Sequence, residues 1–367
     1  MFKQYKLKNY KFILIALVVI LNTIGVALVG SASPGDQKKQ IIGMVSGIII
    51  MLLVSYIDYN FILRFSWLIY LGAVGLLGLV IVAGEQSKGA QRWFKIGGFQ
   101  FQPSELVKIL MILFLAYYFM RHEEKINSPR VLFGSFVLIG IPLALILAQP
   151  NLSTTIVLAL VFAAMLFAAG LSYKIVVGVL AVCVPTFFIV LTLIIQDKFP
   201  FIHSYQLGRI MGWLYPDKYP DIAYQQQNSI MAIGSGLLWG KGLGNTDPTS
   251  VKNGKFILEP QNDFIFSILC EELGFIGAAL VVTLFLLLLL RGMSIAVRAR
   301  DKFGALLVVG FVVQVTLQAI LNMAVVTNTI PNTGISLPFF SSGGTSLLML
   351  LGEMGIVLSV SRQTDMV

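Results

Sequence analysis

Long apolar runs alternate with short polar segments along most of the chain. A helix needs about 20 predominantly apolar residues to cross the hydrocarbon core of a bilayer. Ten runs approach this length, and they predict spanning helices over residues 12–30, 40–57, 66–83, 105–120, 131–148, 153–170, 175–196, 264–290, 304–326 and 342–361. We therefore predict an all-α integral membrane protein with ten transmembrane helices, built as a single membrane domain over residues 1–367.

One segment interrupts this alternation. Residues 197–260, between the seventh and eighth predicted helices, are rich in Tyr, Gln, Gly, Asn and Pro. A structureless loop of this length is unusual unless it is functional, and the stretch Tyr224–Leu238 has helical spacing suited to lying on the bilayer surface. A second polar connection, Gly84–Ser104, carries Trp93 and Phe94, which are typical of a membrane interface.

The basic residues of the connections predict the orientation, because Lys and Arg are enriched in cytoplasmic loops. One set of connections, with the chain ends, holds fourteen: Lys3, Lys6, Lys8, Lys11, Arg64, Arg121, Lys125, Arg130, Lys174, Arg291, Arg298, Arg300, Lys302 and Arg362. The opposite short connections hold five: Lys38, Lys39, Lys88, Arg92 and Lys95. Both termini are therefore predicted to be cytoplasmic, and residues 197–260 form a large extracytoplasmic loop between helices 7 and 8.

The composition excludes several classes of protein. The chain is 57% hydrophobic and 12% charged, about half the charged fraction of a soluble domain. Its net charge of +9 would suit nucleic acid, but the basic residues follow membrane topology, so we expect no nucleic-acid partner. Two cysteines in apolar runs and two separated histidines provide neither a disulfide framework nor the spacing of a metal site.

Acidic residues stand at the start of the eighth predicted helix and within it. Asp263 marks its boundary with the long polar segment, and Glu271 and Glu272 follow about two turns later. Carboxylates at membrane depth are costly and therefore functional candidates, whereas an aspartate at a helix N-terminus is also a favourable cap. The two glutamates are too far from Asp263 to act on the same atom, so we expect one of them to pair with a cation or amide on a neighbouring helix. Glu353 in the last span has no evident partner.

Three further segments carry polar or glycine-rich motifs. Glu105 and Lys108 are three residues apart and share a helix face, either as a structural ion pair or as a polar cavity wall that offers Lys108 to an anion. The run Gly234–Gly244 lacks the Walker A pattern and predicts a tight turn whose backbone approaches the membrane or a ligand. The run Ser341–Ser346 predicts an interrupted start of the last helix, which either lines a cavity or caps the helix.

These segments together resemble the SEDS family (RodA, FtsW and SpoVE) over nearly the whole chain. The resemblance is carried by Arg92-Trp, Ile96-Gly97, Gln102-Pro-Ser-Glu105, Gln149-Pro150, Tyr205-Gln206 with Arg209, Ala232-Ile-Gly-Ser-Gly236, Gly240-Lys-Gly242, Asp263-Phe-Ile-Phe266, Glu271-Glu-Leu-Gly274, Pro331, Leu337-Pro-Phe339, Ser341, Gly343 and Gly344. The family usually has an aspartate after Gln-Pro, where this chain has Asn151, which puts in doubt a carboxylate or metal-binding role at that position.

The resemblance implies a peptidoglycan glycosyltransferase that polymerises lipid II at the outer face of the bacterial cytoplasmic membrane, with a class B penicillin-binding protein as its transpeptidase partner. It implies that Asp263 is catalytic. The short tails look more like RodA, the elongation type, than FtsW, the division type, with sporulation use as in SpoVE as another alternative. We expect the polar residues of the motifs to bind substrate, namely Arg92, Gln102, Ser104, Glu105, Lys108, Gln206, Arg209, Lys241 and Ser341.

The implied reaction sets chemical requirements that the residues can meet. The 4-hydroxyl of an acceptor sugar attacks the anomeric carbon of a donor and expels a lipid diphosphate, so a base and positive charge are needed. Asp263 is the predicted base, and Arg92, Lys108 and Arg209 are the predicted cations, a role that a divalent ion such as Mg²⁺ or Mn²⁺ can share. The competing hypotheses are a lipid II flippase and a non-catalytic scaffold; the collection of polar residues at one face favours the enzyme.

Overall fold

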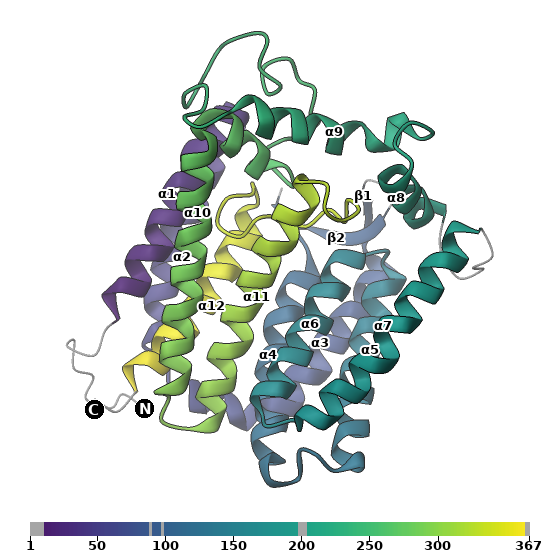
Figure 1. Cartoon of the computed structure of the whole chain (residues 1–367). Helices are drawn as coiled ribbons and strands as arrows, with labels where there is room; N and C mark the ends of the chain where they lie inside the picture. Colours follow the sequence, from purple (N-terminus) through teal and green to yellow (C-terminus); the bar gives the residue numbers. More distant parts are fainter. Residues whose placement is uncertain (1–10, 88–89, 97–98, 197–203, 364–367) are drawn as a thin grey trace.

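The chain folds into a bundle of long helices (Figure 1). The computed structural model describes residues 11–87, 90–96, 99–196 and 204–363. Within this part, nine helices are long and apolar enough to cross a membrane, and α6 is a shorter apolar helix of 17 residues. The ten are α1 (Phe12–Ala32), α2 (Pro34–Ser55), α3 (Ser66–Ala83), α4 (Pro103–Arg121), α5 (Pro129–Ala148), α6 (Leu152–Ala168), α7 (Tyr173–Ile195), α10 (Ile265–Val297), α11 (Lys302–Val326) and α12 (Gly344–Arg362). The prediction of ten apolar helices is confirmed.

Two helices extend more than two residues beyond their predicted bounds. α2 begins at Pro34 instead of residue 40, because a proline at the first helical position and Asp36 in the first turn favour a helix start there. α10 continues to Val297 instead of ending at residue 290. The extension of α2 is polar and that of α10 begins with the charged Arg291, so the apolar length predicts the part of a helix that crosses the bilayer but not where the helix ends.

Both ends of the described chain lie at one end of the bundle. α1 begins and α12 ends there, whereas α8 (Ser204–Leu214) and α9 (Pro220–Ser235) lie across the opposite end (Figure 1). We call these the terminal end and the loop end. This arrangement agrees with an even number of spans. Four lysines used in the charge count, Lys3, Lys6, Lys8 and Lys88, lie outside the described residues.

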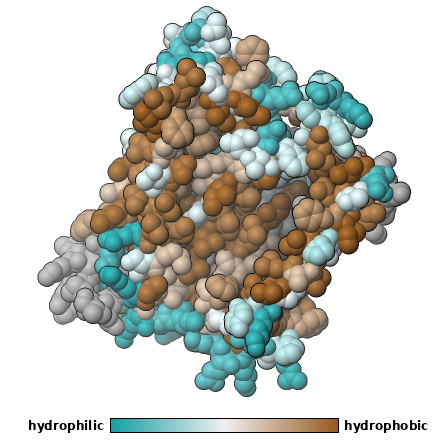
Figure 2. Space-filling model, viewed as in Figure 1, coloured by the Kyte–Doolittle hydropathy of each residue, from teal (hydrophilic) through white to brown (hydrophobic). Residues whose placement is uncertain are grey.

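The centre of the bundle is formed by α4, α11 and α12, whose side chains are mostly buried. The outer helices expose apolar side chains instead, and α7 exposes almost all of its own, including Leu180, Val182 and Phe188. Figure 2 shows the consequence: a broad apolar surface crosses the middle of the molecule, and polar side chains gather at both ends. This distribution is that of a multi-pass membrane protein, in which lipid replaces water around the middle of the helices.

A small sheet at the loop end was not predicted. The connection between α3 and α4 holds three antiparallel strands in the order β1-β2-β3: β1 (Glu85–Ser87), β2 (Ala90–Ile96) and β3 (Phe99–Phe101). Phe94 pairs with Phe101 and Ile96 with Phe99. The sequence carries the signal for this hairpin, because two segments of alternating apolar residues flank a Gly-Gly pair.

The long segment between α7 and α10 is largely ordered. α9 begins at Pro220, four residues before the helical stretch predicted from Tyr224, and it packs on α10 and α11. Its buried polar side chains explain this position: Gln226 Nε2 donates to the carbonyl oxygens of Val325 and Ile330 at 2.9 and 3.0 Å, and Ser229 Oγ to that of Val326 at 2.8 Å. α9 therefore covers the end of α11.

Candidate active site

Asp263 lies two residues before α10, at the loop end, and its side chain is half-buried. Gly334 stands directly beside it, in the segment 327–343 that joins α11 to α12 and that we call the α11–α12 loop. A Cβ atom added to Gly334 would lie 3.3 Å from Asp263 Oδ2 and 3.8 Å from Arg209 Nη1. The carboxylate of Asp263 and the guanidinium of Arg209, from α8, therefore meet at one glycine. Gly334 also has a φ of +73°, which other residues adopt at a cost.

Two side chains fix the backbone around this meeting point. Asn322, which is fully buried on α11, donates from Nδ2 to the carbonyl oxygens of Asp263 and Ile335, both at 2.7 Å. Arg209 Nη1 donates to the carbonyl oxygen of Asn332 at 2.6 Å. One amide thus joins the start of α10 to the α11–α12 loop, and one guanidinium joins α8 to the same loop. The positions of the acid and the cation are set by the same loop.

Ser341 closes the α11–α12 loop against the Asp263 segment. Its Oγ donates to the carbonyl oxygen of Asn262 and accepts from the backbone N–H of Leu337, both at 2.7 Å. The Ser342 N–H also donates to the carbonyl oxygen of Gln261 at 2.8 Å. Ser341, one of the predicted substrate-binding residues, therefore holds the loop next to Asp263.

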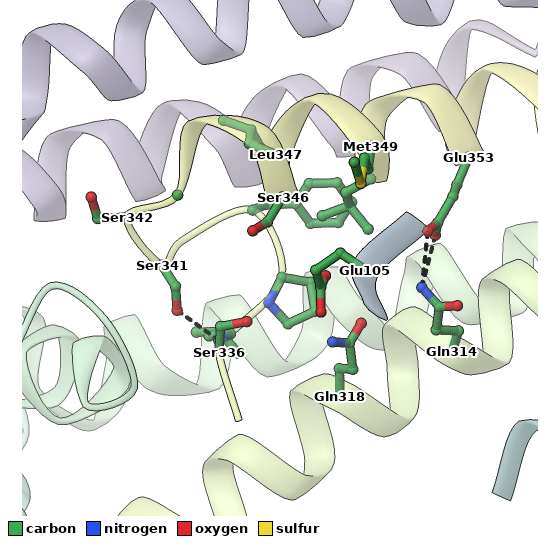
Figure 3. Close-up of a pocket in the computed structure, with 15 residues that line it drawn as sticks. Glu105, Gln314, Gln318, Ser336, Ser341, Ser342, Ser346, Leu347, Met349 and Glu353 are labelled. Atoms are coloured by element: carbon green, nitrogen blue, oxygen red, sulfur yellow. Dashed lines mark hydrogen bonds between the residues drawn. The ribbon is translucent and has the colours of Figure 1, made fainter. Parts of the chain in front are cut away.

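A polar pocket opens beneath this loop, between α4, α11 and α12 (Figure 3). Its polar lining includes the loop residues Ser336, Ser341 and Ser342 together with Glu105, Gln318 and Glu353, and its apolar lining includes Leu337, Phe339, Leu347, Met349 and Leu350. Gly343 precedes α12 without any side-chain cap, and Ser346 in the first turn of that helix also lines the pocket. Of the two alternatives left open for the Ser341–Ser346 run, the structure therefore shows cavity lining.

Both acids of the pocket have a partner. Glu105 Oε1 lies 3.0 Å from Lys108 Nζ, and the Lys108 side chain is only 2% exposed. Glu353 in α12 accepts from Gln314 Nε2 of α11 with both carboxylate oxygens, each at 3.0 Å. The predicted Glu105–Lys108 ion pair is confirmed. It also forms part of a cavity wall, because Glu105 faces the pocket while Lys108 is buried behind it.

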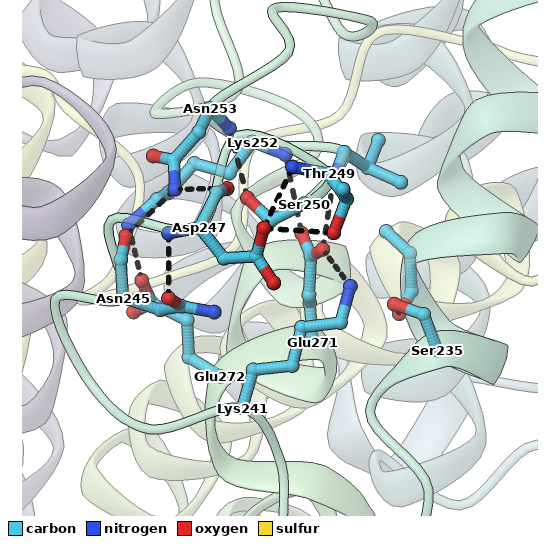
Figure 4. A network of polar contacts seen from close by, with 12 residues as sticks. Ser235, Lys241, Asn245, Asp247, Thr249, Ser250, Lys252, Asn253, Glu271 and Glu272 are labelled. Atoms are coloured by element: carbon cyan, nitrogen blue, oxygen red, sulfur yellow. Dashed lines mark hydrogen bonds and ion pairs between the residues drawn. The ribbon is translucent and has the colours of Figure 1, made fainter.

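A second polar cluster ties the loop after α9 to α10 (Figure 4). Glu271 Oε1 accepts from Lys241 Nζ at 2.7 Å and from the Val251 N–H at 2.8 Å. Glu272 Oε1 accepts from Lys252 Nζ and from Ser31 Oγ of α1, both at 2.5 Å. Both glutamates thus find cationic partners, as expected for one of them, but the cations come from the loop and not from a neighbouring helix.

The glycine-rich run predicted as a tight turn packs its backbone against α10. A Cβ atom at Gly236 would lie 1.9 Å from the Cys270 carbonyl oxygen, and one at Gly240 would lie 2.2 Å from that of Glu272. α10 is interrupted here by Gly274, whose φ is +65° and whose own Cβ position is filled by Gly240 and Leu238. The close approach needs glycine, and its partner is the backbone of α10.

Known proteins share both the sequence and this architecture. The model of the cell cycle protein family that comprises FtsW, RodA and SpoVE matches residues 6–366. The chain belongs to this family. The probable peptidoglycan glycosyltransferase FtsW of Trichlorobacter lovleyi is 37% identical over 98% of this chain and 95% of its own length. The peptidoglycan glycosyltransferase MrdB of Escherichia coli K12 is 33% identical over 96% and 93%. One solved structure that is similar describes the structural coordination of polymerization and crosslinking by a peptidoglycan synthase complex. A chain in it is 27% identical to this one, with a TM-score of 0.79, and the match covers 96% of this chain and 98% of that one.

The motif residues on which the resemblance to the SEDS family rests are not all close together in the structure. Among the predicted cations, it places Arg209 beside Asp263, whereas Lys108 lies on the pocket side and Arg92 on β2. Gln206 belongs to α8, but its side chain lies outside the described part of the structure. Gln102 immediately precedes α4, and its backbone carbonyl oxygen accepts a hydrogen bond from the Glu105 N–H at 3.1 Å.

Ser104 and Asn151 form a buried contact between α4 and α6. Asn151 Nδ2 donates to Ser104 Oγ at 3.1 Å, and Asn151 Oδ1 accepts from the Thr154 N–H at 3.3 Å. Ser104 is 1% exposed. The predicted roles change accordingly: Ser104 joins two helices instead of facing a substrate, and Asn151 is the N-terminal cap of α6.

This capping role explains why the amide of Asn151 can replace the family's usual aspartate. It also predicts the effect of putting aspartate back at this position. Asn151→Asp should leave the free energy of unfolding and the activity nearly unchanged, because Asn and Asp cap helices equally well and the Ser104 hydroxyl can donate to a carboxylate. Asn151→Leu should cost about 1–3 kcal/mol, because it leaves the Ser104 hydroxyl and the Thr154 N–H without this partner. Thermal unfolding of the purified chain measures both; an equal loss for Asp and Leu would show that the amide donor itself is required.

Lys241 is another predicted substrate-binding residue whose partner in the structure lies within the protein. Its ammonium pairs with Glu271, which is 1% exposed, so its charge is already compensated within the fold. The sequence could not show this, because the two residues are 30 positions apart and the glycine-rich turn brings them together.

Glu271→Gln should therefore destabilise the fold by about 1.5–3 kcal/mol, the range for a hydrogen bond to a charged group. The amide keeps one acceptor oxygen but loses the charge that Lys241 and the Val251 and Lys252 N–H groups share. Thermal unfolding in detergent measures the change, with the exposed Glu124→Gln as the matched control. Equal unfolding midpoints for both variants would show that the contacts of the Glu271 carboxylate do not stabilise the fold.

A polar stripe on α11 was not predicted from the sequence. Gln314, Gln318 and Asn322 are spaced four residues apart, so they share one face of the helix. They lie between Glu353 at one end and the Asp263 backbone at the other. The spacing was readable in the sequence and gives Glu353 its missing partner.

Proposed function

We propose that this chain polymerises lipid II into glycan strands, as a peptidoglycan glycosyltransferase. The proposal is supported by its family and by relatives named peptidoglycan glycosyltransferases. The observation that carries it in this structure is the meeting of the Asp263 carboxylate and the Arg209 guanidinium at Gly334. An acid beside a cation at the loop end is the arrangement that the transfer of a sugar from a lipid diphosphate requires.

Each of the two groups has a defined part in the reaction. Asp263 accepts the proton of the acceptor 4-hydroxyl as its oxygen bonds to the anomeric carbon of the donor, a contribution of about 10²–10⁴-fold. The bond between that carbon and the lipid diphosphate breaks at the same centre. Arg209 offers a planar guanidinium to the departing diphosphate, whose developing charge it stabilises.

The interior of the bundle favours polymerisation over the flippase hypothesis. The polar stripe of α11 leads from Asn322 to Gln314 and Glu353, and the polar pocket ends there. Toward the terminal end, the buried residues of α11 from Phe303 to Val312 and of α12 from Met354 to Leu358 are apolar. The buried polar residues Ser359, Ser361 and Arg362 lie beyond this apolar layer, in the last turn of α12. A flippase needs a polar path open to both faces, whereas a polymerase needs a site at one face. The scaffold hypothesis leaves the buried Glu105–Lys108 and Glu353–Gln314 pairs without a purpose.

We place the chain in the bacterial cytoplasmic membrane with both termini in the cytoplasm and the loop end outside. The loop end then faces the side on which glycan strands are built. The short connections at the terminal end carry Arg64, Arg121 and Arg130, in keeping with the enrichment of basic residues in cytoplasmic loops.

A divalent cation fits this site only together with its substrate. Within the described residues no group of three or more His, Cys, Asp or Glu side chains could hold a metal ion. Mg²⁺ is commonly held by one or two carboxylates together with substrate phosphates, so Asp263 and the diphosphate would hold it jointly. When bound, the ion supplies positive charge to the leaving group.

We further propose a class B penicillin-binding protein as partner, supported by the similarity to a chain of a peptidoglycan synthase complex. The predicted elongation role stays a prediction, because the FtsW and MrdB relatives differ little in identity, at 37% and 33%. Depletion in the native cell separates the roles: rounded cells support elongation, and filaments support division.

The test of the proposed activity is polymerisation by the purified chain. The full-length protein in phosphatidylglycerol vesicles is given lipid II carrying a labelled stem peptide, alone and with the partner, and glycan strands are resolved on gels. Strand formation supports the proposal. Movement of labelled lipid II across the bilayer without strand formation would support the flippase instead.

A further inference from the structure

Three consecutive apolar residues project from the loop that follows α9. Leu237 is 79% exposed, Leu238 51% and Trp239 76%, and we call them the 237–239 tip. Leu237 also has a φ of +47°, in the left-handed region where a non-glycine residue costs about 1–2 kcal/mol. The position after a helix end with this backbone is usually glycine. The chain instead keeps a large apolar side chain there and exposes it.

The tip continues the membrane-facing surface of α10. The Phe275 N–H donates to the Leu237 carbonyl oxygen at 2.9 Å, and the Ile276 N–H donates to that of Leu238 at 3.2 Å. Phe275 is itself 68% exposed. Below it, the outward face of α10 carries a series of exposed apolar side chains: Leu280, Val282, Leu286, Leu287 and Leu290. The tip therefore extends the exposed apolar strip of α10.

Helix geometry places the tip at the edge of the hydrocarbon core. Arg291 is the first charged residue of α10 toward the terminal end, and about 20 residues cross the core. Counted from Arg291, the opposite boundary falls near Glu272. α1 gives the same level independently, because its apolar run ends where Ser31 donates to Glu272. The tip lies beside Gly274, at this boundary, and Trp is one of the residues enriched at the membrane interface.

The tip is held rigidly at this depth. The glycines on either side of it pack against the α10 backbone, as described for Gly236 and Gly240. Lys241 follows Gly240 and pairs with Glu271, while the pair of Lys252 and Glu272 ties the rest of the loop to α10 (Figure 4). Preformed rigidity means that insertion needs little further ordering of the chain.

We propose that Leu237, Leu238 and Trp239 form an interfacial anchor that inserts into the leaflet at the loop end, between the lipid headgroups and the upper acyl chains. The occupant of this surface is lipid, because the tip is continuous with the lipid-facing strip of α10 and lies at its upper boundary. The anchor fixes the height of the loop, and with it the start of α10 two turns away, relative to the membrane surface. The inference stands independently of the reaction proposed above.

Depth measurement in a bilayer tests the anchor. The full-length chain with Cys183→Ser and Trp239→Cys carries a nitroxide at position 239, in vesicles of phosphatidylcholine and phosphatidylglycerol. The buried Cys270 is retained. Thr249→Cys, an exposed position on the same loop, is the matched control. We expect oxygen, which concentrates in the bilayer, to relax the label at 239, and a water-soluble nickel chelate to relax the label at 249. Equal access of the chelate to both labels would overturn the proposal.

A second measurement uses the natural tryptophan. The fluorescence difference between the wild-type chain and Trp239→Phe isolates the signal of this residue from the other three tryptophans. Phosphatidylcholine brominated close to the ester should quench that signal more than lipid brominated close to the chain terminus. Absence of quenching by either lipid overturns the anchor. Protection of Trp239 from the aqueous quencher acrylamide only after a partner protein is added would assign the surface to protein docking and overturn it as well.

Discussion

Replacing Asp263 with asparagine is expected to lower the rate of lipid II polymerisation by about 10²–10⁴-fold, the usual contribution of a positioned general base. The asparagine amide has the same shape as the carboxylate, but it cannot take up the proton of the 4-hydroxyl of the acceptor sugar. The bond from Asn322 to the backbone oxygen of residue 263 is kept, so the start of α10 should retain its position. The measurement is the rate of strand formation by purified protein at saturating lipid II.

The control for this substitution is Asp247→Asn. Asp247 is an exposed carboxylate of the same loop, and its Oδ1 accepts from the N–H and hydroxyl of Thr249. This variant should polymerise at the wild-type rate. If Asp263→Asn folds with an unchanged melting temperature and still polymerises like Asp247→Asn, Asp263 is not the base.

The prediction of the helices rested on a physical property that one sequence displays directly. The length of an apolar run reports the thickness of the bilayer, so all ten runs were found in order, including α6 at 17 residues. Helix ends were less accurate, since polar turns such as the one from Pro34 extend a helix beyond the bilayer. The hairpin of β2 and β3 was missed although its alternating residues were visible.

In the candidate site, contacts between residues close in sequence could be predicted, whereas contacts between residues far apart in sequence could not. Neighbouring residues could be paired from helix geometry, as Glu105 and Lys108 were. The meeting of Asp263 with Arg209 depends on Gly334, which lies 71 positions after the acid, and no local pattern indicates that contact. Lys241 shows the converse, because its family motif suggested a ligand while the fold supplies Glu271.

Gly334→Ala is expected to reduce polymerisation by about 10-fold, because the added methyl group displaces its neighbour by a few tenths of an ångström and a misplacement of roughly 1 Å can cost about 10²-fold. The added methyl group would lie 3.3 Å from Asp263 Oδ2, closer than an ordinary contact, and 3.8 Å from Arg209 Nη1. The carboxylate must then move, or the loop must move with its Asn322 and Arg209 contacts. Either change separates the base from the cation. The rate of strand formation measures the loss, at lipid II concentrations that resolve the maximal rate from the affinity.

Gly244→Ala provides a closely matched control for this prediction. Gly244 has the same φ of +73°, so alanine carries the same backbone cost of about 1–2 kcal/mol there. The space around its Cβ position is open within 4 Å. We therefore expect similar melting temperatures for the two variants and a large difference in rate. Equal rates would mean that backbone strain alone accounts for the effect, and that Asp263 and Arg209 tolerate a methyl group between them. A low rate confined to Gly334→Ala places the reacting groups at this glycine, because no other difference between the two substitutions reaches the carboxylate.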